Sequence, residues 1–312
     1  MPPGDRAPGE KLDAYYGLPR KVKFCSRCVI SNQRPNSAVE YHHSKDSDKE
    51  TVAFDGEGIC DACRFAERKR FGNDWDARKA ELHELSRRFE SLPAQYNCLV
   101  PGSGGKDSFY QAHILKYEFG FRPLTVTWAP HMYTDWGWRN HRSWIHAGFD
   151  NVLITPNGQI HRLLTRLAVD NLFHPFQPFI VGQKGLAPKV ASQYGIPLIF
   201  YGENEAEYGN PVSDTESALR DEKYFTASPT DEVLLSGVPV SELVGRYQIP
   251  PYELQQYLPA NSDFVHESAV QVHYLGYYLQ WHPQSAYYYA VEHGGFEPSP
   301  ERTPGTYSKY NS

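Results

Sequence analysis

The chain has 312 residues, of which 40% are apolar and 22% are charged, and its formal net charge is −6. These values exclude a disordered chain, allow one large core or one core with a smaller module, and argue against a broad nucleic-acid-binding surface. No run approaches the roughly 18 apolar residues of a membrane helix, and the first residues lack the apolar segment of a signal peptide, so we expect a cytoplasmic protein with no membrane partner.

A cysteine module is expected over residues 21–70, after a polar N-terminal arm over residues 1–20. The module contains two Cys-x-x-Cys pairs, formed by Cys25, Cys28, Cys60 and Cys63. Two such pairs favour a closed tetrahedral site in which four thiolates bind a structural Zn²⁺. An iron–sulfur cluster or unconnected reduced cysteines are the alternatives. The odd total of five cysteines argues against a disulfide framework.

An alternation of helices and strands is predicted for residues 71–210, beginning with a helix over 73–92. The expected strands cover residues 96–100, 123–129, 151–155 and 197–202. The expected helices between them cover residues 109–120, 139–147, 159–173 and 189–194, with a turn-rich stretch over 174–185. Strands separated by helices at this spacing indicate an α/β fold with a parallel sheet covered on both faces. Cys98 lies in the first strand and is expected to be a core residue.

The C-terminal region, residues 211–312, is rich in aromatic residues and is expected to contribute to substrate or partner binding. Its tyrosines include Tyr274, Tyr277, Tyr278, Tyr287, Tyr288 and Tyr289. Tyrosine rings pack in cores and interfaces, and they also stack on sugars and bases. The spacing alone leaves both roles open.

A glycine-rich loop directly follows the first predicted strand. Its residues are Ser103, Gly104, Gly105, Lys106, Asp107 and Ser108. Backbone N–H groups of such a turn, together with a helix N-terminus, form a site for an anion. The string is neither a Walker loop nor a dinucleotide-binding G-x-G-x-x-G motif. It resembles the S-G-G-x-D-S signature of the PP-loop ATP pyrophosphatases.

This resemblance implies that the six loop residues bind the β,γ-pyrophosphate of ATP and leave the α-phosphorus open to attack. AMP and pyrophosphate would then be the products, and Mg²⁺ would bind through the phosphates. Ser103, Lys106 and Asp107 are the candidate catalytic residues of the loop. Catalysis of this kind depends mainly on positioning and on neutralisation of charge.

Acidic residues follow the last of these predicted strands, at the sheet edge where parallel α/β folds bind ligands. They are Glu203, Glu205 and Glu207, with Asn204 between the first two. Glu203 and Glu207 are candidates for Mg²⁺ binding, ammonia handling or general-base catalysis, and a solvated acidic loop is the alternative. Lys184 is a candidate to balance a phosphate or a substrate carboxylate, with a surface lysine as the alternative.

Seven stretches of the sequence together resemble the N-acetyl sugar amidotransferases, the WbpG/PseA-like family of surface-polysaccharide biosynthesis. In chain order they read KFCSRCVISNQRPN, GICDACRFAERK, VPGSGGKDSFYQAHILK, VTWAPHMYTDWGWRNH, HPFQPFIVGQKG, YGENEAEYGN and HYLGYYLQWHPQ. The resemblance covers most of the chain from about residue 20. It implies an adenine nucleotide alpha hydrolase-like (PP-loop) domain, preceded by the zinc module and followed by the aromatic-rich region. Members of the family continue for several tens of residues past the segment GTYSKY, near which this sequence ends.

The same resemblance implies conversion of an acetamido group into an acetamidino group in lipopolysaccharide O-antigen or nonulosonic acid biosynthesis. The substrate would be a nucleotide-linked or free N-acetylated sugar acid. Its acetamido oxygen attacks the α-phosphorus of ATP, and ammonia then displaces AMP. The family obtains ammonia from a HisH-like glutaminase with a HisF-like companion, similar to the two halves of imidazole-glycerol phosphate synthase. This sequence contains no evident glutaminase domain, in agreement with such a partner.

Two other functions are compatible with the same motifs. A PP-loop tRNA-modifying enzyme of the thiolation type would favour a basic face and a reactive cysteine near the loop. A non-catalytic zinc-ribbon interaction protein would not need the complete loop from Ser103 to Ser108.

Overall fold

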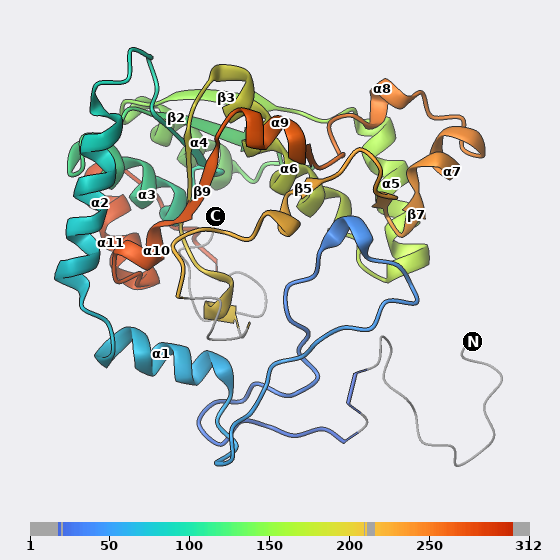
Figure 1. Ribbon diagram of the computed structural model, residues 1–312, viewed down its shortest axis with the longest axis horizontal. Coiled ribbons are helices and arrows are strands. Elements are labelled where there is room, and N and C mark those ends of the chain that lie inside the picture. The colour runs from blue at the N-terminus through green and yellow to red at the C-terminus, as the bar shows by residue number, and fades with distance from the viewer. Residues whose placement is uncertain (1–17, 20, 209, 211–215, 302–312) are drawn as a thin grey trace. The chain divides into compact units, whose positions relative to one another are not determined.

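The computed structural model describes residues 18–19, 21–208, 210 and 216–301 (Figure 1). The expected polar arm therefore lies almost entirely outside the described residues. The chain divides into two compact units, which we describe separately. The cysteine unit comprises Met1–Ala38, Lys45–Asn73 and Glu205–Glu216, and the sheet unit comprises Val39–Ser44, Asp74–Asn204 and Ser217–Ser312.

The cysteine unit contains helix α1 (Asp61–Phe71) and the 3₁₀ helix η3 (Glu205–Tyr208). Short antiparallel bridges join Phe24 to Ser31 and Phe54 to Cys60. A small apolar cluster is built around Cys25, Val52, Ile59 and Cys60. With so little apolar area to bury, the unit has few sources of stability other than its cysteines.

The sheet unit is built on five parallel strands in the order β3-β2-β1-β4-β9. The strands are β1 (Cys98–Pro101), β2 (Pro123–Trp128), β3 (Asp150–Ile154), β4 (Leu198–Tyr201) and β9 (Gln271–Tyr274). The long helices are α2 (Trp75–Glu90), α3 (Lys106–Tyr117), α4 (Asp135–His146), α5 (Gly158–Leu172), α6 (Gln177–Tyr194) and α11 (Pro283–Gly294). The α/β fold with a parallel sheet is as the sequence predicts.

Shorter elements complete the sheet unit. They are η2 (Glu40–His42), η5 (Glu222–Tyr224), β5 (Thr226–Ala227), β6 (Leu234–Leu235), β7 (Val238–Pro239), α7 (Val240–Gly245), α8 (Pro251–Leu254), β8 (Ala260–Asn261), α9 (Ser262–Glu267) and α10 (Leu275–Tyr278). Among the described residues, no helix combines the length and apolar character needed to cross a membrane.

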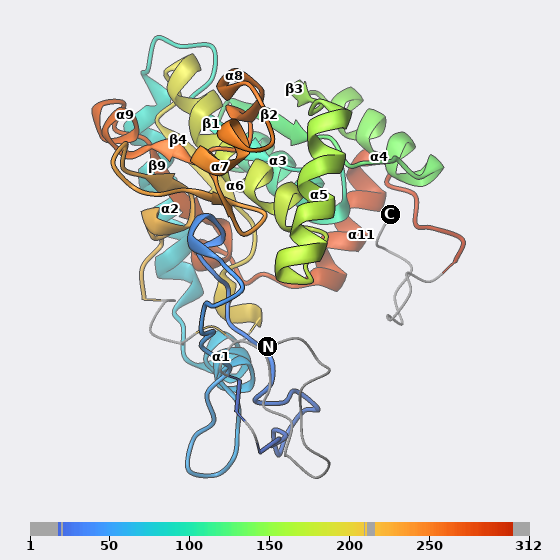
Figure 2. The same ribbon diagram turned by 90° about the vertical axis from the view of Figure 1, so that its right-hand side faces the viewer.

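Side chains of the central strands alternate between two cores, as the two-residue period of a strand requires. Leu99 of β1 and Ile199 of β4 pack with residues of α5 and α6. Cys98 and Val100 face the other way and pack with residues of α2, α3, α4 and α11. Figures 1 and 2 show these helices on the sheet unit. Cys98 is fully buried, as expected for a core residue.

Helix α6 differs from the sequence-based expectation, which placed a turn-rich stretch over residues 174–185. The helix runs without a break from Gln177 to Tyr194 and includes Pro188. Its glycines are packing residues. A Cβ on Gly182 would overlap the indole ring of Trp128, and a Cβ on Gly185 would lie 2.8 Å from the backbone oxygen of Leu258. At these positions glycine allows neighbouring side chains and backbone to pack closely against α6, whereas the sequence pattern alone indicates a turn.

We expect Gly182→Ala to destabilise the protein by about 1–3 kcal/mol, because the added methyl group must displace a buried indole from a packed core. Denaturant unfolding followed by tryptophan fluorescence measures the effect. The matched control is Gly158→Ala in α5, where an added Cβ meets nothing within 4 Å. Equal unfolding midpoints for the two variants would contradict the packing role of Gly182.

Candidate functional site

The loop Gly102–Gly105 lies at the point where the strand order reverses direction. From β1 the chain proceeds through β2 to β3 at one edge of the sheet, and β4 then pairs with the opposite side of β1. The carboxyl ends of β1 and β4 are therefore adjacent, and the connections leave them toward opposite sides. In open parallel sheets this switch point is where ligands bind.

Two glycines of the loop are required by the chain's own packing. A Cβ on Gly102 would overlap the side chain of Ser108. Gly104 has a φ of +86°, and a Cβ there would lie 2.5 Å from the Cα atom of His141 in α4. Gly105 differs, because its φ is −66° and the nearest atom to an added Cβ is the Oγ of Ser103 at 3.7 Å. Nothing within the described chain requires glycine at position 105.

The hydroxyl of Ser108 holds the loop in shape. Its Oγ accepts a hydrogen bond from the backbone N–H of Gly104 at 3.1 Å and donates one to the backbone oxygen of Gly105 at 3.0 Å. The N-cap residue of α3 is Gly105, which provides no side-chain cap. Gly105 thus leaves the N–H groups in the first turn of α3 without a capping side chain. The side chain of Ser103, in the loop just before the helix, is exposed.

Lys106 and Asp107 occupy the first turn of α3 and form an ion pair. The Lys106 side chain is buried, while the Asp107 side chain is one-third exposed. The second carboxylate oxygen of Asp107, Oδ1, is buried and has no hydrogen-bond partner within the part of the chain that is described. A carboxylate at the start of a helix is favoured by the helix dipole.

His141 is a residue of this site that the sequence analysis missed. It is buried in α4 directly behind Gly104, and its desolvation lowers the pKa of the imidazole, partly offset by a hydrogen bond with the Ser103 backbone. The contact with Gly104 is made by the backbone of His141, and the buried imidazole lies in an environment that disfavours its charged form. No local sequence signal indicates this contact, because α4 follows the next strand of the sheet.

The acidic segment after β4 is divided between the two units. Glu203 directly follows Gly202 at the carboxyl end of β4, and the backbone oxygen of Gly202 accepts a hydrogen bond from the N–H of Gly276 at 2.8 Å. Glu207 belongs to the cysteine unit, where both carboxylate oxygens lie 2.8 Å from the Nζ atom of Lys69. The side chain of Glu205 is outside the described residues.

Cationic and aromatic residues adjoin the carboxyl ends of β4 and β9. Lys184 of α6 lies with its Nζ atom 5.6 Å from the ring centre of Tyr224. Arg220, which the sequence analysis missed, is 8% exposed, and its guanidinium carbon lies 4.7 Å from the ring centre of Tyr201. Tyr274 of β9 flanks the same guanidinium at 6.0 Å. Such contacts with aromatic faces stabilise a buried cation.

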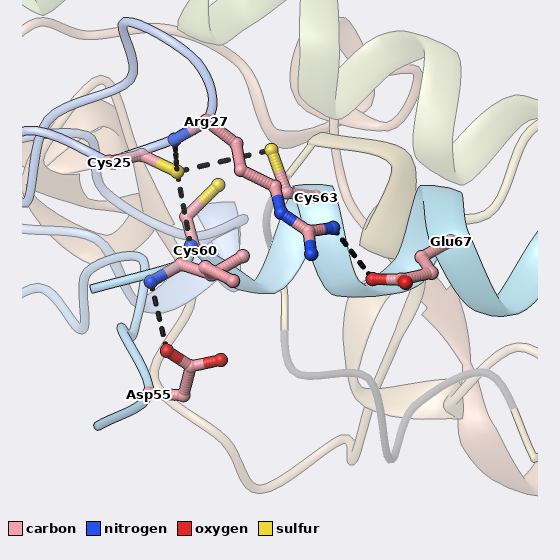
Figure 3. A network of polar contacts seen from close by, with 7 residues as sticks. Cys25, Arg27, Asp55, Cys60, Cys63 and Glu67 are labelled. Atoms are coloured by element: carbon pink, nitrogen blue, oxygen red, sulfur yellow. Dashed lines mark hydrogen bonds and ion pairs between the residues drawn. The ribbon is translucent and has the colours of Figure 1, made fainter. Parts of the chain in front are cut away.

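The cysteines of the two Cys-x-x-Cys pairs come together in the cysteine unit, and Figure 3 shows part of this arrangement. All four Sγ atoms lie within 4.8 Å of one another, with 3.9 Å between those of Cys25 and Cys63 and 3.7 Å between those of Cys28 and Cys60. Residues 29–59 therefore loop out between the pairs. The four sulfur atoms are close enough to bind one metal ion.

Backbone N–H groups point at one of these sulfur atoms. The Sγ of Cys25 accepts hydrogen bonds from the N–H groups of Cys60 at 3.3 Å and Arg27 at 3.4 Å (Figure 3). Burial raises the pKa of the Cys25 thiol, but these hydrogen bonds outweigh it and lower the pKa to about 6. For Cys63, burial raises the pKa. The Cys25 environment favours the thiolate, which is the form that binds a metal.

Comparisons with known proteins give weak similarities. A scan against protein-family models found no match. An uncharacterised protein of Methanocaldococcus jannaschii is 28% identical over 102 residues, which make up 33% of this chain and 31% of that protein. The chain thus matches less than a third of that relative.

Several solved structures are similar in part. The NH₃-dependent NAD synthetase of Campylobacter jejuni is 12% identical, with a TM-score of 0.34 over 46% of this chain and 64% of that chain. The U34-tRNA thiolase NcsA of Methanococcus maripaludis is 11% identical, with a TM-score of 0.35 over 92% of this chain and 77% of that chain. The NMN synthetase of Francisella tularensis is 13% identical, with a TM-score of 0.31. At these identities and TM-scores the likenesses carry no argument about activity, substrate or cofactor.

We expect Cys60→Ser to reduce the metal content of the purified protein strongly, because it removes one of four ligands from a closed site. Elemental analysis measures the metal-to-protein ratio, and titration of accessible thiols reports loss of the cluster. Cys98→Ala is the matched control, since Cys98 is buried in β1 and lies outside the cluster. Retention of full metal content by Cys60→Ser would contradict the four-thiolate site.

Proposed function

We propose that the chain is an ATP-dependent, AMP-forming amidotransferase that converts the acetamido group of an N-acetylated sugar acid into an acetamidino group. One observation carries the proposal. The complete string from Ser103 to Ser108 forms the turn between β1 and α3, at the switch point of a parallel sheet. The position of this motif, at the carboxyl end of a parallel strand where such sheets bind ligands, supports the proposal.

The loop supplies the groups that a pyrophosphate requires. Backbone N–H groups at the start of α3 and the ammonium of Lys106 neutralise the β- and γ-phosphates, and the exposed hydroxyl of Ser103 donates to a phosphate oxygen. Glycine at position 105 is explained by close approach of a phosphate, because the chain's own packing does not require it. Ser108 acts through the loop backbone, since its hydroxyl is engaged there.

In each step of the proposed reaction, one bond forms and one bond breaks. The acetamido oxygen attacks the α-phosphorus of ATP, the bond from that phosphorus to the bridging oxygen breaks, and pyrophosphate leaves. Ammonia then adds to the activated carbon, AMP departs with the original oxygen, and the amidine remains. The protein contributes binding of the outer phosphates and alignment of the sugar with the α-phosphorus.

Mg²⁺ is the expected metal on the phosphates. Asp107 is the residue whose surroundings fit it, because its buried Oδ1 atom has no hydrogen-bond partner in the described structure. Bound Mg²⁺ neutralises charge on the phosphate oxygens. Glu203, at the end of β4, is the candidate base for the incoming ammonia, and Lys184 is a candidate partner for a phosphate or a carboxylate. The ion pair of Glu207 with Lys69 favours a structural role for Glu207.

Zn²⁺ is the metal that the four cysteines fit best. Zn–S bonds of about 2.3 Å in a tetrahedron place the sulfur atoms about 3.8 Å apart. Two of the sulfur–sulfur separations, 3.7 and 3.9 Å, lie on either side of that value, and all four sulfur atoms lie within 4.8 Å of one another. An iron–sulfur cluster would hold its thiolates farther apart, because each binds a different iron atom. With four thiolates and no open position, the zinc would stabilise the unit and take no part in the reaction.

The ammonia is proposed to come from a separate glutaminase with a cyclase-like companion. The alternative enzyme, a tRNA thiolase, would use a reactive cysteine near the loop. Cys98 precedes the loop but is fully buried, and desolvation raises the pKa of its thiol. A protonated, inaccessible thiol is a poor nucleophile, which favours the amidotransferase.

Incubation of the protein with ATP, Mg²⁺, ammonium and N-acetylated sugar acids tests the proposal. We expect AMP and pyrophosphate in equal amounts with a product lighter than the sugar by the difference between O and NH, which mass spectrometry detects. Release of ADP and orthophosphate would contradict the PP-loop assignment. AMP formation that requires tRNA, with no sugar modified, would establish the thiolase alternative.

Asp107→Asn is expected to lower the rate of AMP formation by about 100-fold or more, because it removes the carboxylate proposed to hold Mg²⁺ next to the reacting phosphates. The matched control is Asp170→Asn on α5, which also neutralises a carboxylate but lies on the surface. The initial rate of pyrophosphate release is the measurement. If the two variants are equally active, Asp107 is not part of the catalytic site.

A further inference from the structure

A cleft in the sheet unit lies outside the loop and the strand end described above. Its volume is about 600 Å³, and its lining comes from α6, from the loop after β5, from α7, from the segment before β8 and from α9. Helices α6, α7 and α9 are labelled in Figures 1 and 2. This volume is within the range of small-molecule sites. None of its lining residues belongs to the loop between β1 and α3.

Lys189 of α6 is the one cation among the residues that line the cleft. Its side chain is partly buried, and its Nζ atom donates a hydrogen bond to the backbone oxygen of Gln255 at 2.7 Å. In the described part of the chain no carboxylate lies within 4.0 Å of this Nζ atom. Desolvation lowers the pKa of Lys189 to about 8. An ammonium that lines a cleft with no carboxylate beside it is stabilised by an anion that enters the cleft.

The two carboxylates of the lining do not supply that anion. Asp231 accepts a hydrogen bond from the backbone N–H of Ser228 at 2.8 Å and thereby closes a local turn. Glu232 is exposed at the surface. Neither carboxylate therefore pairs with the ammonium of Lys189.

The remaining wall is mostly apolar. Val233, Val240, Leu258 and Phe264 contribute to it, and the ring of Phe264 is half exposed. An apolar body covering these side chains would remove their surface from water, which contributes roughly 25 cal/mol per Å². Charge at one end and an apolar wall beside it define the kind of ligand that fits.

We infer that this cleft binds a small organic anion, in which a carboxylate or a phosphate ester pairs with the ammonium of Lys189 and an apolar body packs against Phe264 and its neighbours. The site is separate from the proposed amidotransferase site, and it does not depend on that function. Carboxylates and phosphate esters both offer anionic oxygen atoms to an ammonium, and the experiment below determines which of the two head groups the cleft prefers.

Titration calorimetry with benzoate, phenyl phosphate and the neutral isostere benzamide tests the inference. We expect one anion per chain, with benzamide binding about tenfold or more weakly, as loss of a charge-assisted hydrogen bond implies. The comparison of benzoate with phenyl phosphate identifies the preferred head group. Equal binding of benzamide and the anions, or no binding of either anion, would overturn the proposal.

Variants locate the site. Lys189→Met is expected to lose about tenfold in affinity, while Lys189→Arg retains the charge and the binding. Lys116→Met is the matched control, since Lys116 also donates to a backbone oxygen, that of Gly148, on the surface of α3. Phe264→Ala removes a half-exposed ring without disturbing the core and should also weaken binding. Unchanged affinity in both Lys189→Met and Phe264→Ala would refute the assignment.

A competition experiment separates this site from the ATP loop. Saturating ATP should leave the binding of benzoate unchanged, and Asp107→Asn should bind benzoate as the unmodified protein does. If ATP displaces the anion, the anion occupies the nucleotide loop and the inference is wrong. Failure of the amidotransferase assay would leave this result unaffected, because no turnover is measured.

Discussion

The close contact between the backbone at Gly104 and helix α4 is the constraint on which the candidate site depends. An added Cβ would lie 2.5 Å from the Cα atom of His141, so the turn passes against α4 with no room for a side chain. On its other side the Oγ of Ser108 accepts from the N–H of Gly104. The turn is thus held between α3 and α4. This leaves the start of α3 at the switch point of the sheet, where an anion can approach it.

The cysteine unit and the strand end after β4 share one segment of chain. Residues that follow Asn204 belong to the cysteine unit, where Glu207 pairs with Lys69 and the Asn210 side chain accepts a hydrogen bond from the N–H of Ser37 at 3.0 Å. That unit has only a small apolar cluster, which includes two of the four cysteines among its buried residues. The segment that follows Asn204 is thus held within the cysteine unit by these contacts.

How much the sequence could predict depends on whether the signal is local. The strands β1 to β4 and the loop after β1 were predictable because apolar runs and a glycine-rich string are consecutive in the chain. The four-cysteine cluster was predictable from ligand spacing. By contrast, Arg220 and His141 reach the site through tertiary packing, and β9 is four residues in an aromatic-rich region with no strand pattern. For α6, glycines that pack against Trp128 resemble the glycines of a turn, so composition gave the wrong element.

Lys184 and Lys189 show why position on one helix does not define a lysine's role. Burial raises the pKa of the Glu40 carboxyl, but His43, whose Nδ1 atom lies 3.7 Å from Oε2 of Glu40, and the charge of Lys184 outweigh it and hold the pKa below its usual value. Lys184 thus already has a buried carboxylate nearby, and a substrate anion would have to compete with Glu40 for it. Lys189, on the same helix, has no such neighbour in the described chain, and only desolvation acts on it. Of the two lysines, Lys189 is therefore the one without a neighbouring carboxylate among the described residues, and it is the one that lines the cleft.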